Sequence, residues 1–208
     1  PPDPLPRGLT GGFETSARRG AVVARAAEKL RIEADFVPDV VFGHVGWGES
    51  LYLKEVWTDA RLLMYAEFYW RSKGLYFDFD EAVYPRSFEQ ALSAATTAAS
   101  LTAALSNADR IVSPTLWQAE SFPAVFRDKT SVIHDGIDTA ATAPDAGATI
   151  SIPQRGLTFR PGDEIVSFVN RTLEPHRGFH IFMRALPAVL AARPEAHVII
   201  IGGTDGGY

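Results

Sequence analysis

The chain has 208 residues, 46% of them hydrophobic, which is enough apolar content to bury a core in one large domain or two small ones. Its net charge is −5 with scattered lysines and arginines, which argues against a nucleic-acid-binding surface. The lack of cysteine excludes disulfides, thiolate nucleophiles and cysteine-based zinc sites. Because neither a membrane-span pattern nor a signal-peptide pattern is present, we expect a cytoplasmic protein.

The first elements are a lead-in, a helix and a strand. An extended or disordered lead-in is predicted by four prolines, Pro1, Pro2, Pro4 and Pro6. Apolar residues at helical spacing then predict a helix over residues 14–32. The β-branched run of residues 38–44 predicts a buried strand that ends at His44 on the edge of a sheet, followed by a short helix from about Glu49.

The next stretch contains the clearest helix signal. Residues 61–68 predict a second buried strand, and the aromatic segment from there to Pro85 predicts a long loop, a candidate lid. Ser87 and Gln90 form a capping-box pattern, and apolar residues at helical spacing follow as far as Asn107. We therefore expect a long helix after the loop.

Strands and helices continue to alternate. Residues 108–113 and 130–134 predict strands, with a helix over residues 115–121 between them. Such alternation implies parallel strands joined by right-handed crossovers. The predicted fold class is α/β, with a Rossmann-like parallel sheet.

A linker separates this sheet from a second one. Residues 135–147 contain turn-forming glycine and proline and few apolar residues, which indicates an interdomain linker. Beyond it the pattern predicts a hairpin turning at residues 154–156, a buried strand (164–169), a helix with a kink at Pro187 (178–193) and another buried strand (197–201). We assign residues 13–140 to the first domain and residues 141–208 to the linker and the start of the second.

The segment VNRTLEPHRGF, residues 169–179, is the strongest candidate site. It lies between a predicted strand and a predicted helix, where open α/β sheets bind ligands. The guanidinium groups of Arg171 and Arg177 could converge on one diphosphate near the helix N-terminus. Glu174, in the same segment, is a further candidate for the donor cleft. The alternative is a solvated pair of arginines neutralised by Glu174.

This segment, followed by an apolar helix and HVIIIGG, resembles the donor domain of the retaining GT-B glycosyltransferases of family four. The resemblance implies a GT-B type fold, with a Rossmann-like acceptor domain and a second Rossmann-like domain for the donor. It also implies transfer of a hexose-type sugar from a UDP- or GDP-sugar to a carbohydrate or glycoconjugate acceptor, with Arg171 and Arg177 on the donor diphosphate. The segment VIHDGID, residues 132–138, resembles the segment with which the acceptor domain ends in this family.

The resemblance further implies that the chain is incomplete. The family's downstream pair of glutamates and its first Rossmann strand have no counterpart in the sequence, so we expect these 208 residues to be inactive alone. We expect neither a metal nor a bound cofactor, because the arginines act where a metal otherwise could. Peripheral contact with a membrane is left open.

On the acceptor side, residues 43–50 (GHVGWGES) follow a predicted strand. The acceptor cleft is expected to be lined by Gly46, Trp47, Gly48 and Glu49. His44 and Glu67, each at a predicted strand end, are the candidate catalytic residues, and Glu67 stands where many family members carry a histidine. The alternatives are a tight turn with Trp47 packed in the core, and an ordinary strand-end carboxylate at Glu67.

The glycine-rich end of the chain is a weaker signal. Gly202 and Gly203, with Gly206 and Gly207, resemble a loop that approaches the donor, although a complete dinucleotide-binding pattern is missing. His176 and His180 are four residues apart, but Gly178 argues against a shared helix face, so no metal site is predicted. Two other functions stay open: a non-hydrolysing nucleotide-sugar epimerase, and a non-catalytic module that binds sugars or nucleotide-sugars.

Overall fold

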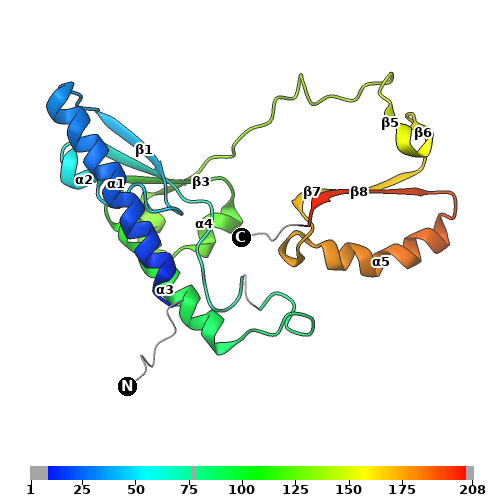
Figure 1. Cartoon of the computed structure of the whole chain (residues 1–208), viewed down its shortest axis with the longest axis horizontal. Helices are drawn as coiled ribbons and strands as arrows, with labels where there is room; N and C mark the ends of the chain where they lie inside the picture. The colour runs from blue at the N-terminus through cyan, green and yellow to red at the C-terminus, as the bar shows by residue number, and fades with distance from the viewer. Residues whose placement is uncertain (1–8, 76–77, 205–208) are drawn as a thin grey trace. The chain divides into compact units, whose positions relative to one another are not determined.

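The structure, a computed structural model, describes residues 9–75 and 78–204. The chain divides into two compact units, unit 1 (Pro1–Gly136) and unit 2 (Ile137–Tyr208), and each is described by itself (Figure 1). The proline-rich lead-in predicted from Pro1, Pro2, Pro4 and Pro6 lies outside the described residues.

Unit 1 is a parallel sheet with helices. Its elements are α1 (Gly11–Glu33), β1 (Val40–His44), α2 (Leu53–Val56), β2 (Arg61–Tyr65), α3 (Phe88–Ser106), β3 (Arg110–Ser113), α4 (Leu116–Ser121), the 3₁₀ helix η1 (Ala124–Lys129) and β4 (Thr130–Val132). The strands are ordered β1-β2-β3-β4, and all three pairings are parallel. The predicted α/β class with a Rossmann-like parallel sheet is confirmed.

The helix α3 begins where its capping box predicts. The Ser87 hydroxyl accepts a hydrogen bond from the backbone N–H of Gln90 at 3.1 Å, and the Gln90 side-chain oxygen accepts one from the backbone N–H of Ser87 at 2.9 Å. These two bonds satisfy backbone donors that have no partner within the helix.

The core of unit 1 lies between α3 and one face of the sheet. Leu101 and Leu105 of α3 are buried with Leu62 and Met64 of β2 and Ile111 of β3. The helix α1 lies beside α3 and buries Ala27 in a second, smaller cluster (Figure 1). Alternate residues of each strand therefore face these helices.

The strand β1 differs from its prediction as a buried strand. Val40 is 58% exposed and Phe42 is 63% exposed, whereas the intervening Val41 packs against the core. β1 is one of the two outer strands of this sheet. Its first residues alternate between an exposed face and the face covered by helices, and do not show the continuous burial that its composition suggested.

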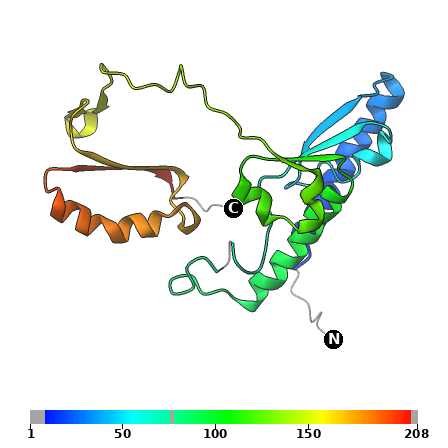
Figure 2. The ribbon, with the colours of Figure 1, turned by 180° about the vertical axis from the view of Figure 1, so that it is seen from behind.

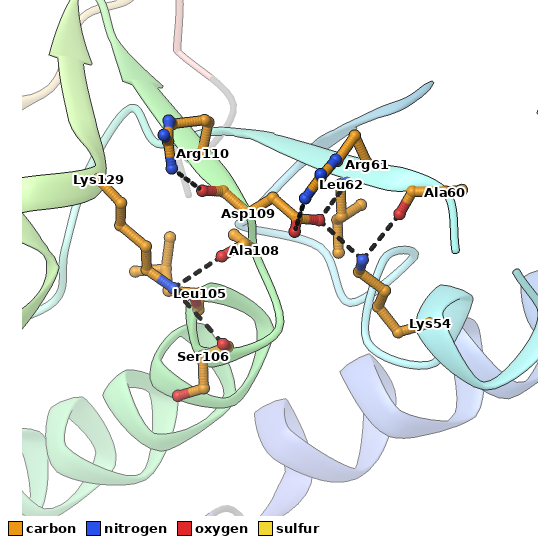
Figure 3. A network of polar contacts seen from close by, with 10 residues as sticks. All are labelled: Lys54, Ala60, Arg61, Leu62, Leu105, Ser106, Ala108, Asp109, Arg110 and Lys129. Carbon is orange, nitrogen blue, oxygen red and sulfur yellow. Dashed lines mark hydrogen bonds and ion pairs between the residues drawn. The ribbon is translucent and has the colours of Figure 1, made fainter. Parts of the chain in front are cut away.

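At the amino ends of the strands, Asp109 organises a network of charges (Figure 3). Its carboxylate lies 2.7 Å from Nζ of Lys54 and 3.3 Å from Arg61, and it accepts the backbone N–H of Leu62 at 2.8 Å. The hydrogen bond from Lys54, followed by that from Leu62, lowers the pKa of Asp109 to about 2. This edge of the sheet is thus stabilised by an ionised carboxylate.

Lys129 closes the carboxyl end of α3 in the same network (Figure 3). Its ammonium group donates to the carbonyl oxygens of Leu105 at 2.6 Å, Ala108 at 2.8 Å and Ser106 at 3.4 Å. Carbonyl groups at a helix end lack intrahelical donors and carry partial negative charge, so a cation stabilises them. Burial lowers the pKa of Lys129.

Unit 2 contains a hairpin and a strand-helix-strand segment. Its elements are β5 (Ile150–Ile152), the 3₁₀ helix η2 (Pro153–Arg155), β6 (Leu157–Phe159), β7 (Ile165–Thr172), the 3₁₀ helix η3 (Pro175–Arg177), α5 (Phe179–Ala192) and β8 (His197–Gly203). β5 and β6 pair antiparallel, whereas β7 and β8 pair in parallel. Phe168 of β7 packs against Phe179 and Phe182, so α5 covers one face of this pair (Figure 2).

Several helices and strands begin or end at other residues than the sequence predicted. The helix expected from Glu49 begins at Leu53, after a turn, and β2 ends at Tyr65 and not at Phe68. β7 continues through Thr172, because its parallel pairing with β8 resumes at Gly203 after an irregularity. Arg171 therefore belongs to a strand and not to the loop that the sequence predicted.

Candidate active site

The carboxyl ends of the strands of unit 1 meet at one edge of the sheet, where open α/β sheets bind ligands. β1 ends at His44 and β2 ends at Tyr65, and these two residues are partners in the parallel register. Glu67 follows shortly after β2. Nε2 of His44 lies 3.5 Å from Oε2 of Glu67, so the structure brings the two predicted catalytic residues together.

The backbone of Gly46 determines which nitrogen of His44 carries a proton. Nδ1 of His44 accepts a hydrogen bond from the N–H of Gly46 at 2.9 Å, so the proton of the neutral ring is on Nε2. This proton faces the carboxylate of Glu67, whose side chain is 58% exposed. The pair can therefore offer both a hydrogen-bond donor and an acceptor to a hydroxyl group.

Aromatic rings surround His44. Trp47 stacks with it at a centroid distance of 6.1 Å, and Tyr65 packs against it at 5.6 Å. Trp47 is 41% exposed, so it lies at the surface and not in the core. An exposed indole face of this kind can stack on a sugar ring.

The other predicted acceptor residues contact the protein itself. A Cβ at Gly46 would lie 2.9 Å from Cε1 of His44, so this glycine makes room for the imidazole ring. Gly48 has a φ of +93° and lies against the backbone of Ser16 in α1. The carboxylate of Glu49 lies 3.5 Å from Arg19. These contacts position the loop after β1.

A second pair of residues at this edge was not predicted from the sequence. The hydroxyl of Tyr65 donates to the carboxylate of Asp135, with distances of 2.8 and 3.0 Å to its two oxygens. Burial, followed by the hydrogen bond and charge of Asp135, raises the pKa of Tyr65 to about 12. The two residues are 70 positions apart, and only the resemblance of residues 132–138 to a family segment drew attention to this region.

In unit 2, the predicted diphosphate-binding residues flank a turn before α5. Arg171 lies near the end of β7, and Arg177 ends η3 directly before Gly178, which has a φ of +79°. Nε of Arg177 lies 3.1 Å from Oε1 of Glu174, so the ion pair considered as an alternative does form. Glu174 is thereby a partner of Arg177 within the protein.

Gly202 and Gly203, at the end of β8, lie beside the same turn. A Cβ at Gly202 would be 2.7 Å from Cδ2 of Leu173 and 2.9 Å from the carbonyl oxygen of Asn170. The carbonyl of Gly203 accepts the N–H of Leu173 at 2.9 Å. These glycines allow the end of β8 to approach the turn. Gly206 and Gly207 lie outside the described residues.

Two kinds of feature are absent from the described residues. Among them, no three histidine or acidic side chains converge in a way that could hold a metal ion, and His176 and His180 lie on separate helices, η3 and α5. No described helix has the length and apolar character needed to cross a membrane.

Comparison with known proteins gives one family and one set of distant structures. A family model described as "Glycosyl transferase family 4 group" matches residues 2–142. No curated protein gives a significant match. Among solved structures, one provisionally described as a UDP-N-acetylglucosamine 2-epimerase from Listeria monocytogenes is similar, with 16% identity and a TM-score of 0.46. The similarity covers 89% of this chain but only 45% of the length of that one.

Proposed function

The chain belongs to the glycosyl transferase family 4 group, and from this premise we propose that its protein transfers a sugar from a nucleotide diphosphate sugar to a carbohydrate or glycoconjugate acceptor. In this proposal unit 2 binds the diphosphate of a UDP- or GDP-sugar, and unit 1 binds the acceptor. The two parts of the proposal rest on different residues, so each can be tested separately.

The position of two arginines around the start of α5 carries the donor part. Arg171 near the end of β7 and Arg177 directly before the helix flank the same turn. The first backbone N–H groups of α5 have no partner within the helix and carry partial positive charge. A diphosphate is the small ligand that best suits two guanidinium groups next to a helix N-terminus.

The arginines would act on the leaving group. As the bond between the anomeric carbon and the diphosphate oxygen breaks, the electron pair stays on the diphosphate and its negative charge grows. Arg171 and Arg177 stabilise that charge more strongly in the transition state than in the bound donor. Arg177 would exchange part of its contact with Glu174 for the phosphate oxygens.

On the acceptor side, Glu67 and His44 suit one hydroxyl group. The Nε2–H of His44 donates to the hydroxyl oxygen, and the exposed carboxylate of Glu67 accepts the hydroxyl proton as the new bond to the anomeric carbon forms. The face of Trp47 supports the sugar ring. In this scheme His44 is a positioning donor and Glu67 is the base.

Two further features of the proposal come from the family resemblance. The anomeric configuration is retained, which proton NMR of the product would test directly. The reaction needs no metal, since two guanidinium groups already neutralise the diphosphate. Activity that is abolished by a chelator and restored by a divalent cation would contradict this second feature.

Calorimetric titration with UDP, GDP and their sugar conjugates, without added metal, tests the donor site. Charge-assisted hydrogen bonds contribute about 1.5 to 3 kcal/mol, so Arg171→Ala and Arg177→Ala should each weaken binding about tenfold or more. Arg193→Ala is the matched control. That residue also forms an ion pair with a glutamate, Glu164, at 2.9 Å, but it follows the carboxyl end of α5.

Saturable binding that is weakened in both site variants and retained in Arg193→Ala would support the donor site and identify the base. Equal affinities in all three variants would refute it. The epimerase alternative differs in its products, because only a transferase releases nucleotide in proportion to added acceptor.

A further inference from the structure

The same local motif occurs at both outer strands of the sheet in unit 1. Directly at the end of β1, Nδ1 of His44 accepts the N–H of Gly46 at 2.9 Å. Shortly after β4, Nδ1 of His134 accepts the N–H of Gly136 at 3.0 Å. Both are His-x-Gly turns at the carboxyl edge, and the strand order places them at opposite ends of it.

The chemical consequence is also the same. Because Nδ1 accepts a hydrogen bond, the neutral ring of His134 carries its proton on Nε2, as the ring of His44 does. His134 is exposed, and within residues 9–75 and 78–204 the structure gives its Nε2 no hydrogen-bond partner. A donor held in one tautomer is thus presented to solvent at this end of the edge.

An acceptor follows this donor in the chain. Asp135 is exposed, and its carboxylate accepts a hydrogen bond from the hydroxyl of Tyr65, with distances of 2.8 and 3.0 Å to its two oxygens. A carboxylate has about four lone-pair positions, so capacity for a ligand remains. Tyr65 stays protonated and holds Asp135 in place, because its pKa is raised to about 12.

We propose that His134 and Asp135, with Tyr65 as their positioning residue, form a second hydroxyl-binding subsite for a carbohydrate. A sugar hydroxyl both donates and accepts, so an N–H donor and a carboxylate acceptor on consecutive residues match it. The inference rests on the proposed function in one respect: it assigns the carbohydrate to the acceptor whose reacting hydroxyl binds at His44 and Glu67.

The separation of the two subsites defines the length of the ligand. β1 and β4 are separated by three strand spacings, about 14 Å. This separation of the strand backbones exceeds the length of one pyranose ring, so we expect the acceptor to be an oligosaccharide, or a sugar joined to a further polar group.

The test is a titration of the protein with methyl glycosides, followed by long-range proton–nitrogen NMR of its five histidine side chains. The probes are methyl pyranosides of glucose, mannose, galactose and N-acetylglucosamine, together with methyl glycosides of their disaccharides. We expect at least one disaccharide glycoside to shift the Nε2 resonances of both His44 and His134. The corresponding monosaccharide should bind about tenfold more weakly.

Matched variants show whether the contacts are the proposed ones. Asp135→Asn and His134→Gln should weaken disaccharide binding about tenfold, and Tyr65→Phe should weaken it less, since it removes only the positioning bond. Asp128→Asn and Tyr52→Phe are surface changes of the same kind in unit 1 and should have no effect. A dispersed backbone spectrum for each variant verifies its fold, and His134→Gln tests the subsite even if Tyr65→Phe unfolds.

Two results would overturn the subsite. One is that no glycoside, tested up to its solubility limit, shifts the Nε2 resonance of His134. The other is equal affinity in Asp135→Asn and Asp128→Asn. The donor titration remains independent, because its arginines belong to unit 2. Nucleotide binding without a response of His134 would refute only the subsite, whereas a response of His134 without nucleotide binding would refute only the transferase proposal.

Discussion

Gly20 of α1 and Gly48 of the loop after β1 touch through their backbones. A Cβ at Gly20 would lie 2.5 Å from the carbonyl oxygen of Gly48, and a Cβ at Gly48 would lie 2.3 Å from that of Ser16. Arg19, next to Gly20 on α1, also donates a hydrogen bond to the carbonyl oxygen of Trp47 at 3.4 Å. The helix therefore fixes the loop that presents Trp47.

Gly48→Ala should destabilise unit 1 by about 2 kcal/mol or more, because it adds a steric clash to a strained positive φ. Gly74→Ala is the control: its φ of +83° is comparable, but a Cβ there meets no atom of the described residues within 4 Å. Urea unfolding of both variants separates the two contributions. Equal losses of stability would show that the contact with α1 is unimportant.

Asp109→Asn should remove part of the acid sensitivity of unit 1. The carboxyl pKa is lowered from 3.8 to about 2, so the stabilisation is present above the ordinary value and is lost as the pH falls through about 2. Near neutral pH the variant should have a free energy of unfolding lower by roughly 1 to 3 kcal/mol than that of the unchanged protein. On acidification its free energy of unfolding should fall less. Unfolding free energies measured across this pH range, with Asp128→Asn as control, provide the check.

Tyr65 should ionise at a higher pH than an ordinary tyrosine. Its pKa is raised from 10 to about 12, so the associated stability is present below pH 10 and is lost as the pH rises through about 12. Ultraviolet difference absorbance of the protein minus Tyr65→Phe isolates this group. Asp135→Asn should move its titration to lower pH, since a neutral amide no longer opposes the phenolate. An unchanged midpoint would contradict the link between the two residues.

Ser50→Ala should leave stability unchanged or raise it by up to about 1 kcal/mol. Ser50 is only 1% exposed, and no hydrogen-bond partner for its hydroxyl is found in the described structure. Burial of an unpaired hydroxyl costs free energy that the alanine variant avoids. Ser113→Ala is the contrasting control, because that buried hydroxyl donates to Ala66 at 2.8 Å. The midpoint temperature of thermal unfolding should shift by a different sign or size in the two variants.

The sequence predicted most elements because their signals are local. The capping box of Ser87 and Gln90 and the apolar runs of the strands depend on neighbours a few residues away. The predicted position of His44 at a strand end also holds, since the glycine-rich stretch that follows ends β1.

Contacts between distant segments could not be predicted in this way. The pairing of Tyr65 with Asp135 depends on the order of the strands, and the contact of Gly48 with Ser16 depends on where α1 crosses the sheet. Arg171 was expected in a loop because nothing in its own segment shows that β8 extends the strand. Diphosphate binding by the two arginines stays a prediction.

The two edges of the sheet in unit 1 differ in how their polar groups are used. At the amino edge, Asp109 and Lys129 are engaged with neighbouring parts of the same fold. At the carboxyl edge, Glu67, His134 and Asp135 remain open to solvent. Mutations at the carboxyl edge should therefore cost unit 1 less folding free energy than mutations at the amino edge, so the carboxyl edge can vary in sequence while the fold is kept.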